Sequence, residues 1–387
     1  MPTSRPQRVA IVHEWLIDRA GSERVLEQIM ALYPDATLYT LIDRMPAADR
    51  ELFPSRRTVT SFLDRWPGIT RYFTRTLPLM PFAMQQFDLS GHDLVISSSH
   101  TVAKGVIVPP DALHLCYCHS PMRYVWDMQG VYLAQERLDR GVKGWLARAL
   151  LHRLRLWDMA SHHGADQIAA NSHFVRRRIW KAWRREAEVI HPPVDVAAAL
   201  TAAPVAREPR HLVTVGRLMP YKNVALIIEA MRLLPDWRLT VIGDGPQKRQ
   251  LQAQAPANVR FAGAVVEADK QTWLARATAF VFAAVEDFGI APAEALAAGT
   301  PVVALAQGGA LDYLVHQQNA LLFDEATPLS LAEAVRATEP LWQGDTGLAQ
   351  RCRDSVAHLG EARFREAFST WVDRHWQDWC QSLAAPR

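Results

Sequence analysis

Short apolar runs alternate with helical patterns along this chain, and the alternation restricts the folds open to it. In the first half, the runs that predict strands are Val9–Val12, Leu94–Ser97, His114–Tyr117, Gln167–Ala170 and Glu188–His191. Strand-like runs separated by helical segments are typical of a parallel sheet covered by helices. The first half therefore predicts one such sheet.

This pattern stops at Pro192-Pro193, and an Ala-, Pro- and Arg-rich stretch up to Arg210 predicts a linker. Further strands are then expected at His211–Val215, Arg238–Ile242, Val259–Phe261, Ala279–Phe282 and Pro301–Ala304. A chain of 387 residues is also too long for one ordinary core. We predict an α/β fold with two Rossmann-like domains, residues 1–195 and 196–363, with a helix at 364–387 packing back on the first.

Targeting signals and disulfides are not expected. No run of about 18 uncharged apolar residues predicts a membrane-spanning helix, and His13, Glu14 and Asp18 interrupt any signal peptide. We therefore expect a cytoplasmic protein whose cysteines are unpaired. Cys116-Tyr117-Cys118-His119 lacks a second half-site with suitable spacing, so no metal site is predicted there.

Two clusters in the second half carry candidate chemistry. Arg217 and Lys222 follow a strand that ends at Gly216 and precede a new helix, a pattern that favours a diphosphate clamp. In the second cluster, Glu286 lies in a loop and Glu294 in the next helix, on either side of Gly289. Carboxylates accept hydrogen bonds from vicinal hydroxyls, so these two predict contacts to sugar and ribose.

A glycine turn after the first strand adds a third candidate. Ala20-Gly21-Ser22-Glu23 opens a helix, and Gly21 allows backbone N–H groups to approach an anion.

The second cluster resembles the Glu-x7-Glu signature of glycosyltransferase family 4, which has the GT-B fold. Gly216-Arg217 with Lys222-Asn223 resembles the family's phosphate motif, and Gly243-Asp244-Gly245-Pro246 its nucleotide-side loop. First-domain motifs resemble a bacterial subgroup of GDP-mannose-dependent mannosyltransferases of O-antigen and exopolysaccharide assembly. They are Val12–Leu16, Gly21–Val25, Ser97–Gly105, Cys116–Tyr124 and Ala170–Val175.

The resemblance implies two facing domains with a deep interdomain cleft, and a role for each matching residue. Arg217 and Lys222 would hold the donor diphosphate, Glu286 the transferred sugar and Glu294 the ribose. His119 would reach the sugar and Ser172 phosphate or acceptor. Backbone groups of the two glycine-containing loops would line the donor: Gly243, Gly245, Phe288, Gly289 and Ile290.

Three positions depart from the family pattern. Ala20-Gly21 replaces the usual Gly-Gly, Leu311-Asp312 stands where relatives carry Pro-Glu, and Asn319-Ala320 replaces Asn-Gly. They bear on specificity more than on activity.

The sequence predicts a reaction without a metal cofactor. No Asp-x-Asp motif is present to hold a divalent metal ion. The positively charged side chains of Arg217 and Lys222 would take the place of the metal ion. The resemblance implies retention of anomeric configuration. Because no second carboxylate is poised as a nucleophile, same-face attack is our hypothesis.

Basic and aromatic residues interleave between Arg56 and Pro81, and a second basic run extends from Arg176 to Arg185. Such interleaving suits an anionic membrane interface. We therefore expect peripheral association with the inner face of the cytoplasmic membrane, and a polyprenyl-diphosphate-linked oligosaccharide as acceptor. Nucleic acid is not an expected partner.

Other functions stay open at this point. They are the same reaction with a UDP- or ADP-sugar, a sugar-nucleotide epimerase or phosphorylase, a glycosidase using the two glutamates, and a non-catalytic nucleotide-sugar binder. A dehydrogenase is disfavoured because no Gly-x-Gly-x-x-Gly turn follows either first strand.

Overall fold

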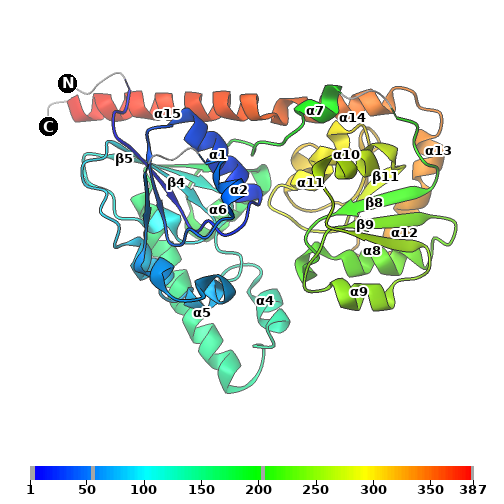
Figure 1. Cartoon of the computed structure of the whole chain (residues 1–387), viewed down its shortest axis with the longest axis horizontal. Coiled ribbons are helices and arrows are strands. Elements are labelled where there is room, and N and C mark those ends of the chain that lie inside the picture. Colours follow the sequence, from blue (N-terminus) through cyan, green and yellow to red (C-terminus); the bar gives the residue numbers. More distant parts are fainter. Residues whose placement is uncertain (1–4, 54–56, 202–204, 385–387) are drawn as a thin grey trace. The chain divides into compact units, whose positions relative to one another are not determined.

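The computed structural model describes residues 5–53, 57–201 and 205–384 (Figure 1). The chain divides into two compact units. Unit 1 comprises residues 1–193 and 362–387, and unit 2 comprises residues 194–361. Unit 2 is therefore a continuous segment inserted into unit 1.

Unit 1 is built on a seven-stranded parallel sheet of order β3-β2-β1-β4-β5-β6-β7. Its strands are β1 (Val9–His13), β2 (Thr37–Thr40), β3 (Arg57–Thr60), β4 (Leu94–Ser99), β5 (Leu113–Cys118), β6 (Gln167–Ala170) and β7 (Glu188–Val189). Its α-helices are α1 (Gly21–Leu32), α2 (Ala47–Arg50), α3 (Met80–Met84), α4 (Gln129–Gln135), α5 (Gly141–Ser161), α6 (His173–Trp183) and α15 (Glu361–Ala384). Short 3-10 turns are η1 (Phe62–Arg65), η2 (Ile69–Arg71), η3 (Phe73–Thr76), η4 (Ala103–Gly105) and η5 (His162–Gly164).

Unit 2 repeats this design with a six-stranded parallel sheet of order β10-β9-β8-β11-β12-β13. Its strands are β8 (His211–Val215), β9 (Arg238–Ile242), β10 (Val259–Gly263), β11 (Ala279–Phe282), β12 (Val302–Leu305) and β13 (Ala320–Phe323). Its α-helices are α7 (Ala197–Thr201), α8 (Val224–Met231), α9 (Lys248–Gln254), α10 (Glu267–Arg276), α11 (Ile290–Ala297), α12 (Pro328–Arg336), α13 (Thr338–Trp342) and α14 (Leu348–Val356). The 3-10 turns are η6 (Pro220–Lys222), η7 (Gly309–Asp312) and η8 (Ala357–Leu359).

Both sheets reverse their strand order, in unit 1 between β1 and β4 and in unit 2 between β8 and β11. Open parallel sheets bind ligands beyond the carboxyl ends of their strands at this switch point. The predicted α/β class with two Rossmann-like domains is confirmed.

The strand predictions were incomplete. The sequence did not predict β2, β3 or β13, and it ended β4 at Ser97, whereas the strand continues to Ser99. The expected linker contains α7. Residues 202–204 of that linker and residues 385–387 of the expected last helix lie outside the described residues.

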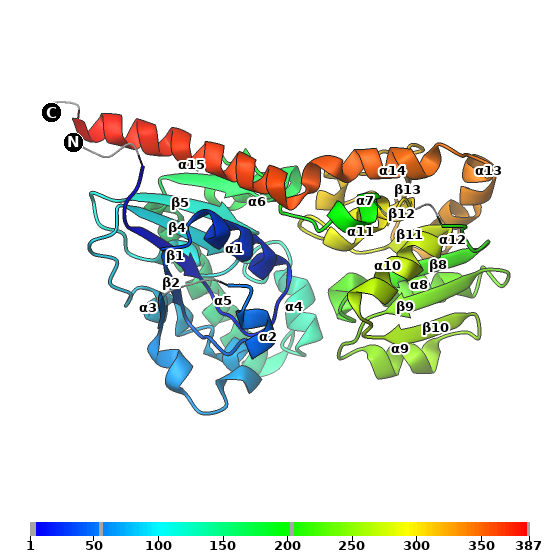
Figure 2. The same ribbon diagram turned by 45° about the horizontal axis from the view of Figure 1, so that its top comes forward.

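The helix α15 completes the core of unit 1. Phe364, Phe368, Trp371 and Trp376 are buried in one cluster with apolar residues of β1, β4 and α1. Both views show α15 running beside α1 (Figures 1 and 2), and Arg365 hydrogen-bonds Gln28 of α1. Aromatic side chains of this size contribute much of a core's burial, so unit 1 depends on a segment far away in the sequence.

A buried ion pair holds α5 to the rest of unit 1. Lys104 is almost fully buried, and its Nζ lies 2.5 Å from Oδ1 of Asp158. The other oxygen, Oδ2, accepts hydrogen bonds of 2.7 Å from the indole N–H groups of Trp126 and Trp183. The Lys104 ammonium also lies 4.9 Å from the centre of the Trp183 ring. Each charge at this site is thus matched by several partners.

Candidate active site

Lys222 and Glu286 meet at the switch point of the second sheet. Lys222 ends η6 in the loop after β8, and Glu286 lies in the loop after β11. Lys222 Nζ lies 2.5 Å from Glu286 Oε1, and the side chains are 21% and 16% exposed. Asn223 takes a left-handed backbone conformation, with φ of 56°, between η6 and α8. The structure therefore joins one residue from each predicted cluster, with both side chains accessible to a ligand.

The loops after β8 and β9 lie directly against each other. Gly216 N–H donates to Ile242 O at 3.0 Å, and Leu218 N–H donates to Asp244 O at 2.8 Å. Gly243 and Gly245 have positive φ, and a Cβ on either would collide with the backbone of Gly216 or Leu218. The two glycines predicted to line the donor are thus also needed for the packing of these loops.

Replacing Gly243 by alanine is expected to destabilise unit 2 by about 1–3 kcal/mol, because the new Cβ overlaps the Gly216 carbonyl and φ is 127°. Urea unfolding measures the loss. Gly216→Ala is the matched control, since its Cβ would meet only the Lys222 side chain, at 3.9 Å. Equal stability of the two variants would contradict the role assigned to Gly243.

Hydrogen bonds from Gly309 of η7 and from Tyr313, which follows η7, hold the loop between β11 and α11 in place. Gly309 N–H donates to Glu286 O at 2.8 Å, and Tyr313 O–H donates to the carbonyl of Gly289. Phe288 is buried against the Tyr313 ring, with centroids 5.3 Å apart. Gly289, with φ of 86°, precedes Ile290, the first residue of α11. This scaffold holds the backbone of Phe288, Gly289 and Ile290 at the N-terminus of a helix.

Glu294 is 5% exposed, and its Oε2 accepts a hydrogen bond of 2.9 Å from Lys270 Nζ. Lys270 lies on α10 and also pairs with Glu267 at 2.9 Å. No motif in the sequence predicted a role for Lys270. Its only local signal was the spacing of three residues between Glu267 and Lys270, which is common on helix surfaces.

A small pocket in unit 2 opens where β8, β9 and β11 end. Its lining includes Thr214, Gly216, Leu218, Lys222 and Ala283. Arg217, the second predicted clamp residue, lies next to the lining residue Gly216. Lys222 is the cationic residue of this lining, so the pocket offers an ammonium group to an anion at the strand ends.

In unit 1, His119 belongs to a buried polar chain at the ends of β1, β4 and β5. His119 Nε2 lies 2.9 Å from Ser98 Oγ, which lies 3.2 Å from Nδ1 of His13. His13 Nε2 lies 3.3 Å from Oε1 of Glu23 in the first turn of α1. Glu23 Oε2 accepts from Ala20 N–H at 3.0 Å and so closes the start of that helix.

A second buried carboxylate lies beside this chain. Glu14 Oε1 accepts from the backbone N–H groups of His100, Thr101 and Ala103, at 2.8–3.1 Å, and from Ser99 Oγ. Its Oε2 lies 3.1 Å from His100 Nδ1. Burial alone would raise the pKa of Glu14, but His100 and the backbone donors hold that pKa well below its usual value.

In the sequence, these residues occur within motifs, and a role was predicted for His119 alone. His13, Glu14, Glu23 and His100 come together because β1 and β4 pair in parallel, with His13 opposite Ser98. A usable signal was polar residues at the end of an apolar strand, where the fold places ligands.

Burial lowers the pKa of His119 to about 3. Between pH 3 and the ordinary histidine pKa of about 6.5, the unfolded chain therefore binds more protons than the folded chain, and stability falls as the pH drops below about 6.5. His119→Asn should lose less stability than wild type between pH 7 and pH 5, as measured by urea unfolding. His152→Asn, at an exposed position of α5, is the control. An identical pH response in His119→Asn and wild type would refute this assignment.

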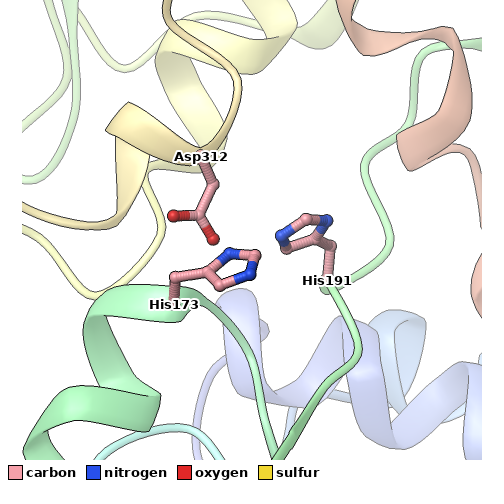
Figure 3. Close-up of side chains that lie close together, drawn as sticks. All are labelled: His173, His191 and Asp312. Carbon is pink, nitrogen blue, oxygen red and sulfur yellow. The ribbon is translucent and has the colours of Figure 1, made fainter.

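The other two predicted residues of unit 1 lie at helix starts. Gly21 is the first residue of α1. Ser172 caps α6 and accepts from Val175 N–H at 3.0 Å. Next to it, the rings of His173 and His191 lie 6.1 Å apart (Figure 3). Asp312, also labelled there, belongs to η7 of unit 2 and is one of the positions that departs from the family pattern.

Four more observations concern the earlier expectations. All four cysteines are free thiols. No helix in the described part of the chain combines the length and apolar character needed to cross a bilayer. Arg178 pairs with Asp127 at 2.7 Å, and Arg185 donates to three backbone carbonyls. The basic run from Arg176 to Arg185 is therefore partly used inside unit 1. Arg56 lies outside the described residues.

Comparison with known proteins points to one family. Residues 201–349 match the family model Glycosyl transferases group 1. The chain is 28% identical over 170 residues to the uncharacterized glycosyltransferase YqgM of Bacillus subtilis, covering 41% of this chain and 47% of YqgM. It is 28% identical over 197 residues to the lipopolysaccharide core biosynthesis glycosyltransferase LpsD of Rhizobium meliloti, covering 48% of this chain and 55% of LpsD. The chain thus spans about half the length of these relatives.

The fold resembles solved structures over nearly its whole length. Anabaena Alr3699/HepE in complex with UDP matches with a TM-score of 0.70 at 16% identity, covering 95% of this chain and 100% of HepE. Residues 201–349 of this chain are therefore similar to the glycosyl transferases group 1 family, and the chain has a GT-B fold of two Rossmann-like domains.

Proposed function

We propose that the chain is a glycosyltransferase that moves a sugar from a nucleotide diphosphate donor to an acceptor hydroxyl. The observation that carries this proposal is the Lys222–Glu286 pair, accessible at the switch point of unit 2 and inside the segment that matches the family. A cation suits a diphosphate and a carboxylate suits sugar hydroxyls. One ligand containing both groups would satisfy both side chains.

In the proposed reaction, the bond between the anomeric carbon and the donor phosphate oxygen breaks and a bond to the acceptor oxygen forms on the same face. The acceptor proton passes to the departing phosphate oxygen. Lys222 and Arg217 stabilise the negative charge that develops there. Glu286 orients the sugar, and Glu294, held by Lys270, binds the ribose. The reaction proceeds with retention and without a metal ion.

The proposed donor is GDP-mannose, because the motifs of the first domain resemble those of GDP-mannose-dependent mannosyltransferases. A UDP-sugar is the second candidate, because the similar HepE has been solved in complex with UDP-glucose. Both donors present the same diphosphate to Lys222 and Arg217, so the base and the sugar have to be distinguished by experiment.

Thermal stabilisation across GDP-, UDP-, ADP- and dTDP-sugars, without added metal, tests the donor. Stabilisation by GDP-mannose that is reduced in Lys222→Ala supports the proposal. Stabilisation by a UDP-sugar alone would keep the proposed reaction and make the UDP-sugar the donor instead of GDP-mannose. Folded protein that responds to none of the four overturns the function.

The proposed acceptor is a polyprenyl-diphosphate-linked oligosaccharide at a membrane surface. In the predicted docking segment, the side chains of Arg65, Arg71 and Arg75 are exposed. Phe62 and Phe82 are also exposed, and their rings lie 6.0 Å apart. Exposed aromatic rings beside arginines support contact with an anionic interface.

A further inference from the structure

Helix α5 has two apolar sides. One side packs in unit 1, where Leu154 is buried and Leu150, Leu151 and Trp157 pack against the same core cluster. The other side carries Val142, Trp145, Leu146 and Leu156, which are 76%, 66%, 56% and 59% exposed. A helix that only covers a core needs one apolar side, with a polar side facing water. The second apolar side therefore indicates a contact with a surface outside unit 1.

The exposed apolar residues form a stripe along one side of α5, which the polar residues His152 and Arg153 interrupt. Val142, Trp145, Ala149 and Leu156 are three, four and seven positions apart, which places them on one side of a helix. Met159 extends the stripe toward the C-terminal end and is also exposed. Figure 1 shows α5 as the long helix that projects from unit 1 together with α4.

Unit 1 prevents this stripe from turning inward. Asp158 near the end of α5 is bound by Lys104, Trp126 and Trp183. Arg155 donates to the carbonyl of Val125 at 2.7 Å. These contacts fix the rotation of the helix about its axis, so the apolar side stays outward.

The charges on α5 indicate which partner fits. Lys143, Arg148 and Arg153 are exposed on the helix, and its single acidic residue, Asp158, is buried in the ion pair with Lys104. Helical spacing places Arg148 at one border of the apolar stripe, beside Met159, and Arg153 within the apolar side, between Val142 and Leu146. An apolar stripe with basic residues at its border and within it matches the interface of an anionic bilayer, with apolar side chains among the acyl chains and cations among the headgroups.

We propose that the outer side of α5 inserts into the interface of a membrane containing anionic lipids. A second copy of this helix fits less well, because pairing two such faces would bring basic residues together without acidic partners. The inference rests on the proposed function for the reason the chain would reach a membrane, while the contact itself follows from α5.

Vesicle sedimentation tests the proposal with the full chain. Wild type should bind vesicles of phosphatidylcholine with phosphatidylglycerol, and bind pure phosphatidylcholine much more weakly. Trp145→Glu/Leu156→Glu should lower the affinity for the mixed vesicles by about tenfold or more. The matched control is Leu233→Glu/Val266→Glu, which changes two exposed apolar residues of unit 2 and should bind as wild type does.

Several outcomes would overturn the assignment. One is unchanged vesicle binding by Trp145→Glu/Leu156→Glu. Another is loss of binding only in Arg65→Glu/Arg71→Glu/Arg75→Glu, which would place the contact in the predicted segment instead. Light scattering that shows a wild-type dimer, dissociated by Trp145→Glu/Leu156→Glu, would make a second copy the partner. An unchanged melting temperature confirms that each variant is folded.

Donor binding separates this inference from the proposed function. Trp145→Glu/Leu156→Glu should keep its stabilisation by nucleotide sugars, because α5 belongs to the other unit. Wild type that binds vesicles through α5 but no nucleotide sugar would overturn the function and leave the docking surface intact. Nucleotide-sugar binding without vesicle binding would overturn the surface alone.

Discussion

Replacing Lys222 by alanine is expected to lower kcat by roughly a hundredfold or more, with a smaller change in KM. Under the proposed reaction, the Lys222 ammonium faces the charge that grows on the leaving diphosphate, so its contribution increases on the way to the transition state. Loss of one such donor in a preorganised site typically costs on the order of 3–4 kcal/mol of transition-state stabilisation. Steady-state kinetics with the donor identified by thermal stabilisation measures both constants.

Two further variants make this result interpretable. Lys222→Arg keeps the positive charge and should recover part of the lost rate. Arg351→Ala removes an exposed ion pair with Asp345 in the same unit and should leave kcat unchanged. If Lys222→Ala raised KM and left kcat intact, Lys222 would contribute only to ground-state binding.

Replacing Asp158 by alanine should destabilise unit 1 by about 3–5 kcal/mol, the usual cost of leaving one buried charge without its partner. Lys104 would keep its charge in an almost fully buried position, and the indoles of Trp126 and Trp183 would lose their acceptor. Urea unfolding, followed by tryptophan fluorescence, reports the change.

The matched comparison separates charge from shape. Lys104→Met/Asp158→Leu replaces both charges by apolar groups and should recover much of the stability lost in Asp158→Ala, because no uncompensated charge remains. Glu366→Ala removes an exposed partner of Arg363 and should change stability by less than about 1 kcal/mol. If Asp158→Ala were as mild as Glu366→Ala, the ion pair would not be important for holding α5.

The sequence predicted the central strands of both sheets because each is a short, largely apolar run between helical patterns, as in Val9–His13 and Ala279–Phe282. It missed β2 and β3 because they are short and contain threonine beside apolar residues, as in Thr37–Thr40. β3 is a partly exposed edge strand, which shows this weaker pattern, whereas β2 lies inside the sheet between β3 and β1. The end of β4 was missed for a related reason. Ser98 and Ser99 look like loop residues, but both are buried and hydrogen-bonded to His13, His119 or Glu14.

The candidate site was predictable where its residues lie near a glycine in a loop after a strand. Lys222 was predicted in the loop that follows Gly216, and Glu286 in the loop that contains Gly289. Their mutual contact was not predictable in detail, and neither was the link between Lys270 and Glu294. Such contacts depend on how neighbouring parallel strands and helices are aligned, which local patterns do not encode.

The insertion of unit 2 into unit 1 has a consequence for biosynthesis. A ribosome completes the whole of unit 2, residues 194–361, before it makes residues 362–384, and α15 is needed to cover the apolar face of the first sheet. The nascent chain therefore carries that face unprotected while the inserted domain is translated, a period in which chaperones bind exposed apolar surface. Translation order and domain completion are reversed in this chain: the domain that starts first is finished last.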